Sequence, residues 1–189
     1  NVEWIGISVA MQYDSFSNPT IVTRNCPSGG MLDSGGNYTS CAFYDDDLKS
    51  FISRAKANGF KIYLTLAFET SLDLDASPSP ACGTPSYKMA RWLLGRPYID
   101  GNVAKCIAAK DWWWSPSHSL HATNVGLFFN SYKQIAVKYA TLAQQAGVDM
   151  FSLGTETDFL FRTRPDAAPL TNDFKSQLLD MVAAVRAVY

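Results

Sequence analysis

The sequence predicts an α/β protein in which three strands alternate with three helices. Short apolar runs near Trp4, Lys61 and Asp149 indicate strands that are covered on both faces, as parallel strands are. Longer segments between and after these runs carry apolar residues at helical spacing, and Gly59 and Gly147 end two of the helices just before the next strand. Strand and helix therefore alternate along the chain.

The first strand is expected over residues 4–11, and a long irregular connection follows it through Tyr44. A helix is expected over about residues 45–58, since its early aspartates suit the positive end of a helix dipole and Gly59 stops it. The expected buried stripe of this helix consists of Leu48, Phe51, Ile52 and Ala55. The second strand, over residues 61–68, is rich in β-forming residues and has Glu69 at its exit.

The stretch over residues 70–124 is dense in Pro, Ser and Gly and too long for a plain connector, so a functional loop is expected there. A long helix follows, with a buried face of Phe128, Tyr132, Ile135, Ala136, Tyr139, Leu142, Ala143 and Ala146. The third strand then runs from about Asp149 and delivers Glu156 at its end. A final helix is expected from about Asn172, with an apolar face of Phe174, Leu178, Met181, Val182 and Val185.

The long loops after the strands favour a TIM (β/α)8 barrel over an open doubly wound sheet. No GxGxxG or P-loop follows any of the expected strands. A complete barrel takes about 250 residues and eight strands. Residues 1–189 are therefore expected to form a single domain that is an incomplete portion of such a barrel, with three βα units and long disulfide-stapled loops.

The cysteines lie in two Gly/Pro/Ser-rich connections, which suits disulfide staples across long loops. They are Cys26, Cys41, Cys82 and Cys106. Three pairings are formally open, and local closure, first with second and third with fourth, requires the least rearrangement of the chain. A zinc site is the alternative, but there is no CxxC pair and only His118 and His121 could assist, so no metal is expected.

A glycosylation sequon begins at Asn37, between the first two cysteines. Together with the disulfides it favours an extracellular or secretory-pathway protein. The formal net charge of -1 argues against nucleic-acid and membrane-surface partners. No feature of the sequence implies an organic cofactor.

Several motifs together resemble the clan A glycoside hydrolases, and among them the endo-β-mannanase-like (β/α)8 barrels. These motifs are Ser-Val-Ala-Met-Gln-Tyr at residues 8–13, Ala-Asn-Gly at 57–59, Ile-Tyr-Leu at 62–64, the tryptophans ahead of a Phe-x-x-x-Tyr helix, and Phe-Ser-Leu-Gly-Thr-Glu at 151–156. The resemblance implies that the expected strands are barrel strands two, three and four. It also implies that Glu156 is the acid/base of a retaining hydrolase whose nucleophile, on strand seven, lies outside this chain.

By this resemblance the substrate is a β-linked polysaccharide, with β-mannan as first choice. Thr155 stands where the clan usually has Asn, at the position that holds the sugar 2-hydroxyl. The remaining barrel strands are an implied partner, from the same or another chain, and the isolated chain is expected to be inactive. The alternative is a non-catalytic carbohydrate-binding or structural extracellular protein on a hydrolase-derived barrel.

Other residues are expected to contact sugar. Consecutive tryptophans point in different directions, so at least one of the triplet is expected to be exposed, where an indole can stack on the C–H face of a sugar ring. Polar and aromatic side chains at strand exits or in the long loop are further candidates for contacts with hydroxyl groups. The full set is Tyr13, Arg24, Glu69, Trp112, Trp113, Trp114, His118 and Thr155.

Overall fold

A computed structural model describes residues 2–13, 20–26, 41–69, 117, 119–155, 157 and 174–189. Four strands form one sheet in the order β2-β1-β3-β4. They are β1 (Trp4–Tyr13), β2 (Ile21–Val22), β3 (Lys61–Glu69) and β4 (Met150–Thr155). β1, β3 and β4 are parallel neighbours, whereas β2 runs antiparallel to the end of β1.

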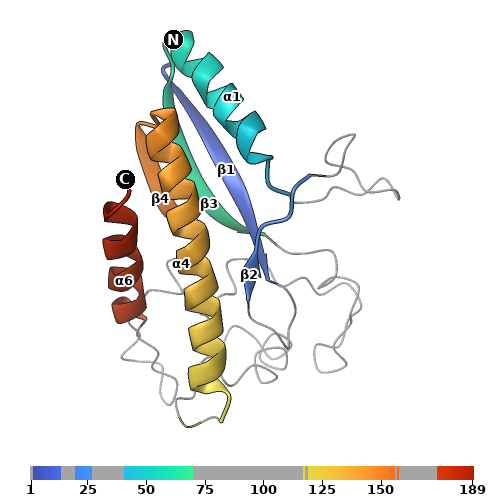
Figure 1. Ribbon diagram of the computed structural model, residues 1–189, viewed down its shortest axis with the longest axis vertical. Coiled ribbons are helices and arrows are strands. Elements are labelled where there is room, and N and C mark those ends of the chain that lie inside the picture. Colours follow the sequence, from blue (N-terminus) through green and yellow to red (C-terminus); the bar gives the residue numbers. More distant parts are fainter. Residues whose placement is uncertain are drawn as a thin grey trace.

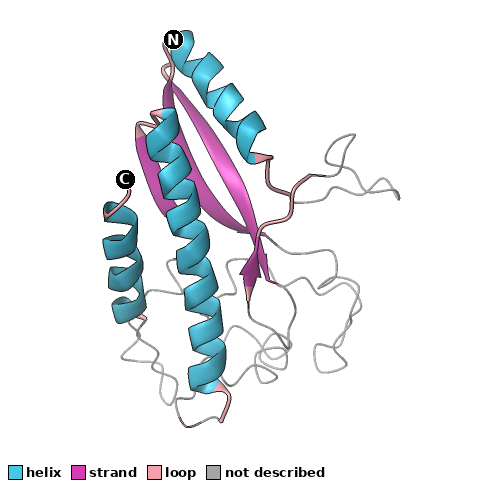
Figure 2. Cartoon of the chain, in the orientation of Figure 1, coloured by secondary structure: helices cyan, strands magenta, loops and turns pink. Residues whose placement is uncertain are grey.

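The helices lie on one side of this sheet, which is curled (Figures 1 and 2). They are α1 (Asp45–Ala57), α4 (His121–Ala146) and α6 (Lys175–Arg186). In the part of the chain that the structure describes, no helix has the length and apolarity needed to cross a bilayer. The mixed α/β architecture expected from the sequence is confirmed, as a half-barrel sheet with its helices outside.

Alternate residues of the strands build the core beneath the helices. Val9 pairs with Leu66 and Met11 with Phe68, and all four side chains are buried. The residues between them point to the other face of the sheet, as strand geometry requires. On that face the first half of β1 carries the exposed residues Trp4, Gly6 and Ser8. One face of the sheet is thus packed, and the other is lined in part by small residues.

Two details differ from the sequence-based expectation. β2 falls in a stretch expected to be irregular, because two residues are too short to show a strand pattern. Phe51, expected in the buried stripe of α1, is 49% exposed, whereas Leu48, Ile52 and Ala55 are buried as expected. Phe51 faces the edge of β1 that has no strand beside it along Ile5 to Ser8 in the described sheet.

The disulfide between Cys26 and Cys41 is confirmed and closes a separation of 15 residues. Backbone hydrogen bonds beside it join the two segments, because the Cys26 N–H donates to the Ala42 carbonyl at 2.9 Å and the Ala42 N–H donates to the Arg24 carbonyl at 2.7 Å. The segment that leads into α1 is therefore held in place by the disulfide and these two hydrogen bonds. Cys82, Cys106 and Asn37 lie outside the described residues.

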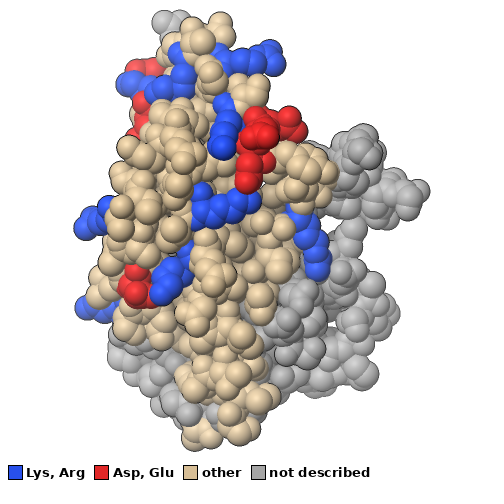
Figure 3. Space-filling model, viewed as in Figure 1, with Lys and Arg blue, Asp and Glu red and all other residues tan. Residues whose placement is uncertain are grey.

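Ion pairs connect the helices to one another. Lys138 of α4 lies 3.0 Å from Asp45 at the start of α1, and Lys133 lies 2.7 Å from Asp180 of α6. Charged side chains of both signs are interspersed over this helical face (Figure 3). Because the paired side chains are partly exposed, each pair contributes at most about 1 kcal/mol and serves mainly to fix how the helices lie.

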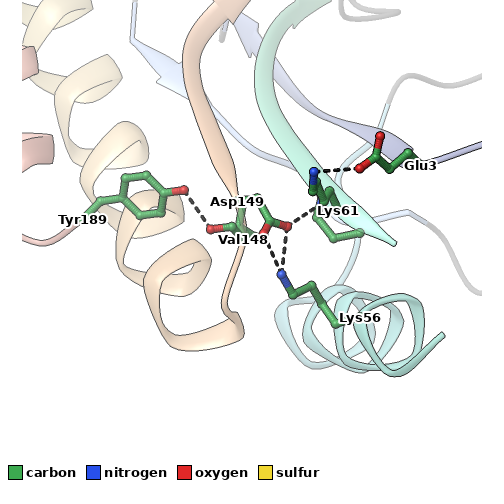
Figure 4. A network of polar contacts seen from close by, with 7 residues as sticks. Glu3, Lys56, Lys61, Val148, Asp149 and Tyr189 are labelled. Atoms are coloured by element: carbon green, nitrogen blue, oxygen red, sulfur yellow. Dashed lines mark hydrogen bonds and ion pairs between the residues drawn. The ribbon is translucent and has the colours of Figure 1, made fainter. Parts of the chain in front are cut away.

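A polar network joins the elements at the amino-terminal edge of the sheet (Figure 4). The carboxylate of Asp149 accepts hydrogen bonds from Lys56 Nζ at 2.7 Å and from the Ile62 N–H at 2.7 Å. Beside it, Lys61 Nζ lies 2.7 Å from Glu3 Oε1. The network ties the end of α1 to the starts of β3 and β4. In a βα barrel this edge serves stability, whereas the opposite edge carries the chemistry.

Asp149→Asn should make stability less dependent on pH in acid. The Lys56 ammonium first, and then the Ile62 N–H, hold the pKa of Asp149 below its ordinary value of 3.8. Below that value the unfolded chain binds more protons than the folded one, so stability is lost as pH falls through the folded pKa. The melting temperature, measured from about pH 5 to about pH 2, should fall less steeply with decreasing pH for Asp149→Asn than for the wild type. Lys56→Met should flatten the curve in the same way, and parallel curves would contradict the assignment.

Candidate active site

The carboxyl ends of the parallel strands come together at one edge of the sheet. Gln12 pairs with Glu69, and Ala67 pairs with Thr155, the last residue of β4. Tyr13 and Glu69 end β1 and β3, as expected, although their side chains lie outside the described residues. The backbone positions that carry several of the predicted site residues are therefore neighbours.

Other predicted site residues lie outside the described part of the chain. Glu156 is among them, although both residues that flank it, Thr155 and Thr157, are described. The others are Trp112, Trp113, Trp114 and His118. Their roles stay predictions.

A β-bulge lies in β4 just before the predicted catalytic position. Thr65 pairs with Ser152 and Ala67 with Thr155, so two steps along β3 match three steps along β4. One extra residue is thus inserted near Leu153 and Gly154. A bulge bends its strand and changes the face to which the following side chains point. Its effect is to place Thr155 beside Ala67 at the carboxyl edge of the sheet.

The bulge is held by hydrogen bonds from outside and inside β4. The Tyr132 hydroxyl, from α4, donates to the carbonyl of Leu153. The Ser152 hydroxyl donates to the Gly154 carbonyl at 3.1 Å and accepts from the Gly154 N–H at 3.4 Å. Burial raises the pKa of Tyr132 far above its ordinary value of 10.0, so its hydroxyl remains a donor. Three backbone groups at the bulge, the carbonyls of Leu153 and Gly154 and the Gly154 N–H, are in this way hydrogen-bonded.

Gly154 is required by the packing around the bulge. A Cβ atom at this position would lie 2.7 Å from Thr157 Cγ2 and 2.8 Å from the Tyr132 hydroxyl oxygen. Real Cβ contacts are longer than this, so any other residue would push the strand or its neighbours away. The Gly-Thr-Glu motif thus has a physical reason for its glycine.

Thr155 is held by the neighbouring strand. Its Oγ1 lies 3.1 Å from Oγ1 of Thr65, and the two hydroxyls share a hydrogen bond. Thr65 is 5% exposed, whereas Thr155 is half-buried. Thr155 therefore retains partial access to solvent at the carboxyl edge, which its predicted contact with substrate requires.

Gln12 is a buried polar residue at the same edge, and it is not among the site residues predicted from the sequence. It is 5% exposed, and its Oε1 accepts a hydrogen bond from Arg24 Nη1 at 3.4 Å. The predicted sugar contact Arg24 is thereby brought next to the end of β1. The signal in the sequence that could have identified Gln12 is a polar residue within the apolar end of an expected strand.

A cavity along β1 lies apart from the carboxyl edge of the strands. It has a volume of about 500 Å³ and lies between the first half of β1, the start of α1 and the disulfide. Its walls include Ile5, Ser8, Phe43 and Phe51. The cavity follows the unpaired edge of β1, away from the strand exits. Within the described ranges, no cluster of three or more His, Cys, Asp or Glu side chains could hold a metal ion.

Comparison with known proteins finds similarity in structure alone. No protein-family model and no curated protein sequence matches the chain. The GH113 β-mannanase AaManA from Alicyclobacillus acidocaldarius, in complex with ManMIm, has a TM-score of 0.59 and 16% identity over 99% of this chain and 41% of that one. A GH113 β-1,4-mannanase has a TM-score of 0.55 and 16% identity over 99% of this chain and 42% of its own.

The chain spans about two fifths of the length of these structures. At 16% identity the likeness shows the fold, which is that of part of a GH113 (β/α)8 barrel. The strands of the described residues account for only part of such a barrel. The resemblance to the mannanase-like barrels of the clan A glycoside hydrolases, predicted from the sequence motifs, is therefore confirmed at the level of the fold.

Proposed function

We propose that this chain is part of a retaining glycoside hydrolase that cleaves a β-linked polysaccharide, with β-mannan as first choice. The observation that carries the proposal is the position of Thr155. It ends a parallel strand of a GH113-like half-barrel, at the edge where barrel enzymes place catalytic residues, and Glu156 is the next residue in the sequence. The GH113 structures are β-mannanases, which suggests the substrate.

In this proposal Glu156 is the general acid/base. Retaining hydrolysis needs one carboxylic acid to protonate the leaving oxygen and a second carboxylate, about 5–5.5 Å away, to attack the anomeric carbon. The first group then deprotonates the water that releases the glycosyl-enzyme. The nucleophile belongs to strand seven of the complete barrel, outside this chain, so the isolated chain should be inactive.

The remaining strands are the proposed partner, supplied by the same or another chain. β1 has no neighbour along Ile5 to Ser8 on the edge away from β3, and β4 pairs only with β3 among the described strands. Unpaired edges invite further strands. The apolar cavity beside β1, with the exposed Phe43 and Phe51, lies where the preceding βα unit of a barrel would pack.

Sugar contacts are proposed for side chains at the carboxyl edge and in the long loop. They are Tyr13, Glu69, Trp112, Trp113, Trp114, His118 and Thr155. Secretion, glycosylation of Asn37 and a second disulfide between Cys82 and Cys106 are proposed on the sequence features alone. The site needs neither metal nor organic cofactor for this chemistry.

Hydrolysis of β-mannan by the protein that carries the remaining strands tests the proposed function. The released ends are counted, cellulose serves as the comparison polysaccharide, and proton NMR follows which anomer forms first. Mannan should be cut faster than cellulose, with the β-anomer first, because two displacements retain configuration. An α-anomer formed first would contradict retention. Binding of mannan without any hydrolysis would favour the non-catalytic carbohydrate-binding alternative.

A further inference from the structure

We infer that Tyr132 and Thr65 are positioning residues that fix the direction in which Glu156 leaves β4. The inference rests on the proposed function and adds two positioning residues to the same site. The observations are the bulge in β4 and the two contacts that hold it, one on each side of Gly154. Each contact comes from a different element, α4 on one side and β3 on the other.

The first contact holds the backbone before Gly154. Tyr132 is fully buried, and its ring packs edge-on against Phe68 with centroids 4.9 Å apart. A second edge-on contact joins the Tyr132 and Phe128 rings at 6.0 Å. The ring therefore has little freedom, and its hydroxyl reaches the Leu153 carbonyl from a fixed point. The bulge is pinned to α4 by a side chain that is itself immobilised.

The second contact holds the residue after Gly154. The Thr65 side chain is buried, and Thr155 is bonded directly to Glu156 along the chain. The hydrogen bond between the Thr65 and Thr155 hydroxyls fixes Thr155 relative to β3. Glycine has the most backbone freedom of any residue, so a pinned residue on either side of Gly154 limits the directions in which Glu156 can leave the strand.

A general acid must lie within hydrogen-bond reach of the oxygen that it protonates. Small displacements are costly, since misplacement by about 1 Å can reduce the rate by about a hundredfold. Loosening the bulge should therefore weaken proton donation specifically. A loosened bulge should have little effect on the cleavage of substrates whose leaving group needs no proton. That difference separates a positioning role from a general effect on folding.

Tyr132→Phe and Thr65→Val test the inference in the protein that carries the remaining strands. For each variant, kcat/KM is measured on a mannan oligosaccharide and on a dinitrophenyl β-mannoside, whose leaving group departs without protonation. Each variant should lose about ten- to a hundredfold on the oligosaccharide and much less on the dinitrophenyl substrate. Thr65→Ser, which retains the hydroxyl, should restore the wild-type ratio between the two substrates.

Tyr139→Phe is the matched control. Tyr139 is also buried in α4, but its hydroxyl makes no hydrogen bond to the described backbone of β4. Its removal should leave the ratio of the two kcat/KM values unchanged. Circular dichroism establishes that each variant folds. The substitutions at Tyr132 and at Thr65 test the inference separately.

Glu156→Gln, assayed on both substrates, separates failure of the inference from failure of the proposed function. Selective loss of activity on the oligosaccharide in Glu156→Gln supports the proposed function. If Tyr132→Phe and Thr65→Val then lose activity equally on both substrates, or on neither, the positioning role is overturned and the proposed function stands. If Glu156→Gln retains full activity on both, Glu156 is not the acid/base and the positioning role fails with that assignment. A wild-type protein that cleaves neither substrate would overturn the proposed function itself.

Discussion

Glu156→Gln should lower kcat/KM for β-mannan by about 10²–10⁴-fold, the usual contribution of general acid–base catalysis. The amide cannot donate a proton to the departing sugar oxygen, although its size is nearly that of the carboxyl group. The loss should be much smaller on a dinitrophenyl β-mannoside, since its leaving group needs no proton. Initial rates on the two substrates, in the protein with the remaining strands, measure this selectivity.

Glu3→Gln is the control for this prediction. Glu3 lies at the opposite edge of the sheet, where its exposed carboxylate pairs with Lys61 at 2.7 Å. The same chemical change at that position should leave kcat/KM unchanged on both substrates. Full activity of Glu156→Gln on β-mannan would show that the proton comes from another group.

Gly154→Ala should destabilise the protein by about 1–3 kcal/mol, as overpacking of a filled site does. It should also lower the activity on β-mannan. The added Cβ would lie 2.7 Å from Thr157 Cγ2 and 2.8 Å from the Tyr132 hydroxyl oxygen. Relief requires that β4 and the Tyr132 hydroxyl move apart, which strains the hydrogen bond from that hydroxyl to Leu153. Denaturant unfolding and the mannan assay measure the two effects.

Gly126→Ala is the matched control, since a Cβ at Gly126 of α4 would meet no atom within 4 Å. Alanine in a helix interior is favoured over glycine, so this variant should be more stable by about 0.5–1 kcal/mol. Equal stabilities of Gly154→Ala and the wild type would mean that the close packing around the bulge does not exist in solution.

Local signals explain why much of the fold was predictable from the sequence. The face of α4 that includes Phe128, Tyr132 and Tyr139 is buried as its spacing predicted. The predicted helix stops Gly59 and Gly147 have φ of 84° and 70°, a conformation that glycine adopts without strain. Such features depend on neighbours within a few residues, and a single sequence contains them.

The candidate site was less predictable because its contacts join distant positions. Thr65 and Thr155 are 90 residues apart, and Tyr132 and Leu153 are 21 apart. The bulge results from pairing between β3 and β4, and no pattern within residues 150–155 indicates it. Phe51 was misjudged for a similar reason. Its helical spacing indicates a buried side, but what covers that side depends on a neighbour that the described sheet does not supply.

Azide trapping tests the central claim that Glu156 is the acid/base of a retaining hydrolase. Glu156→Ala, in the protein with the remaining strands, is incubated with a dinitrophenyl β-mannoside and sodium azide. The glycosyl-enzyme still forms, and azide, which needs no general base, should release it as a β-mannosyl azide with a faster rate. Proton NMR of the product distinguishes the outcomes. An α-mannosyl azide would identify Glu156 as the nucleophile instead, and no azide product with an undiminished rate of hydrolysis would contradict any catalytic role for Glu156.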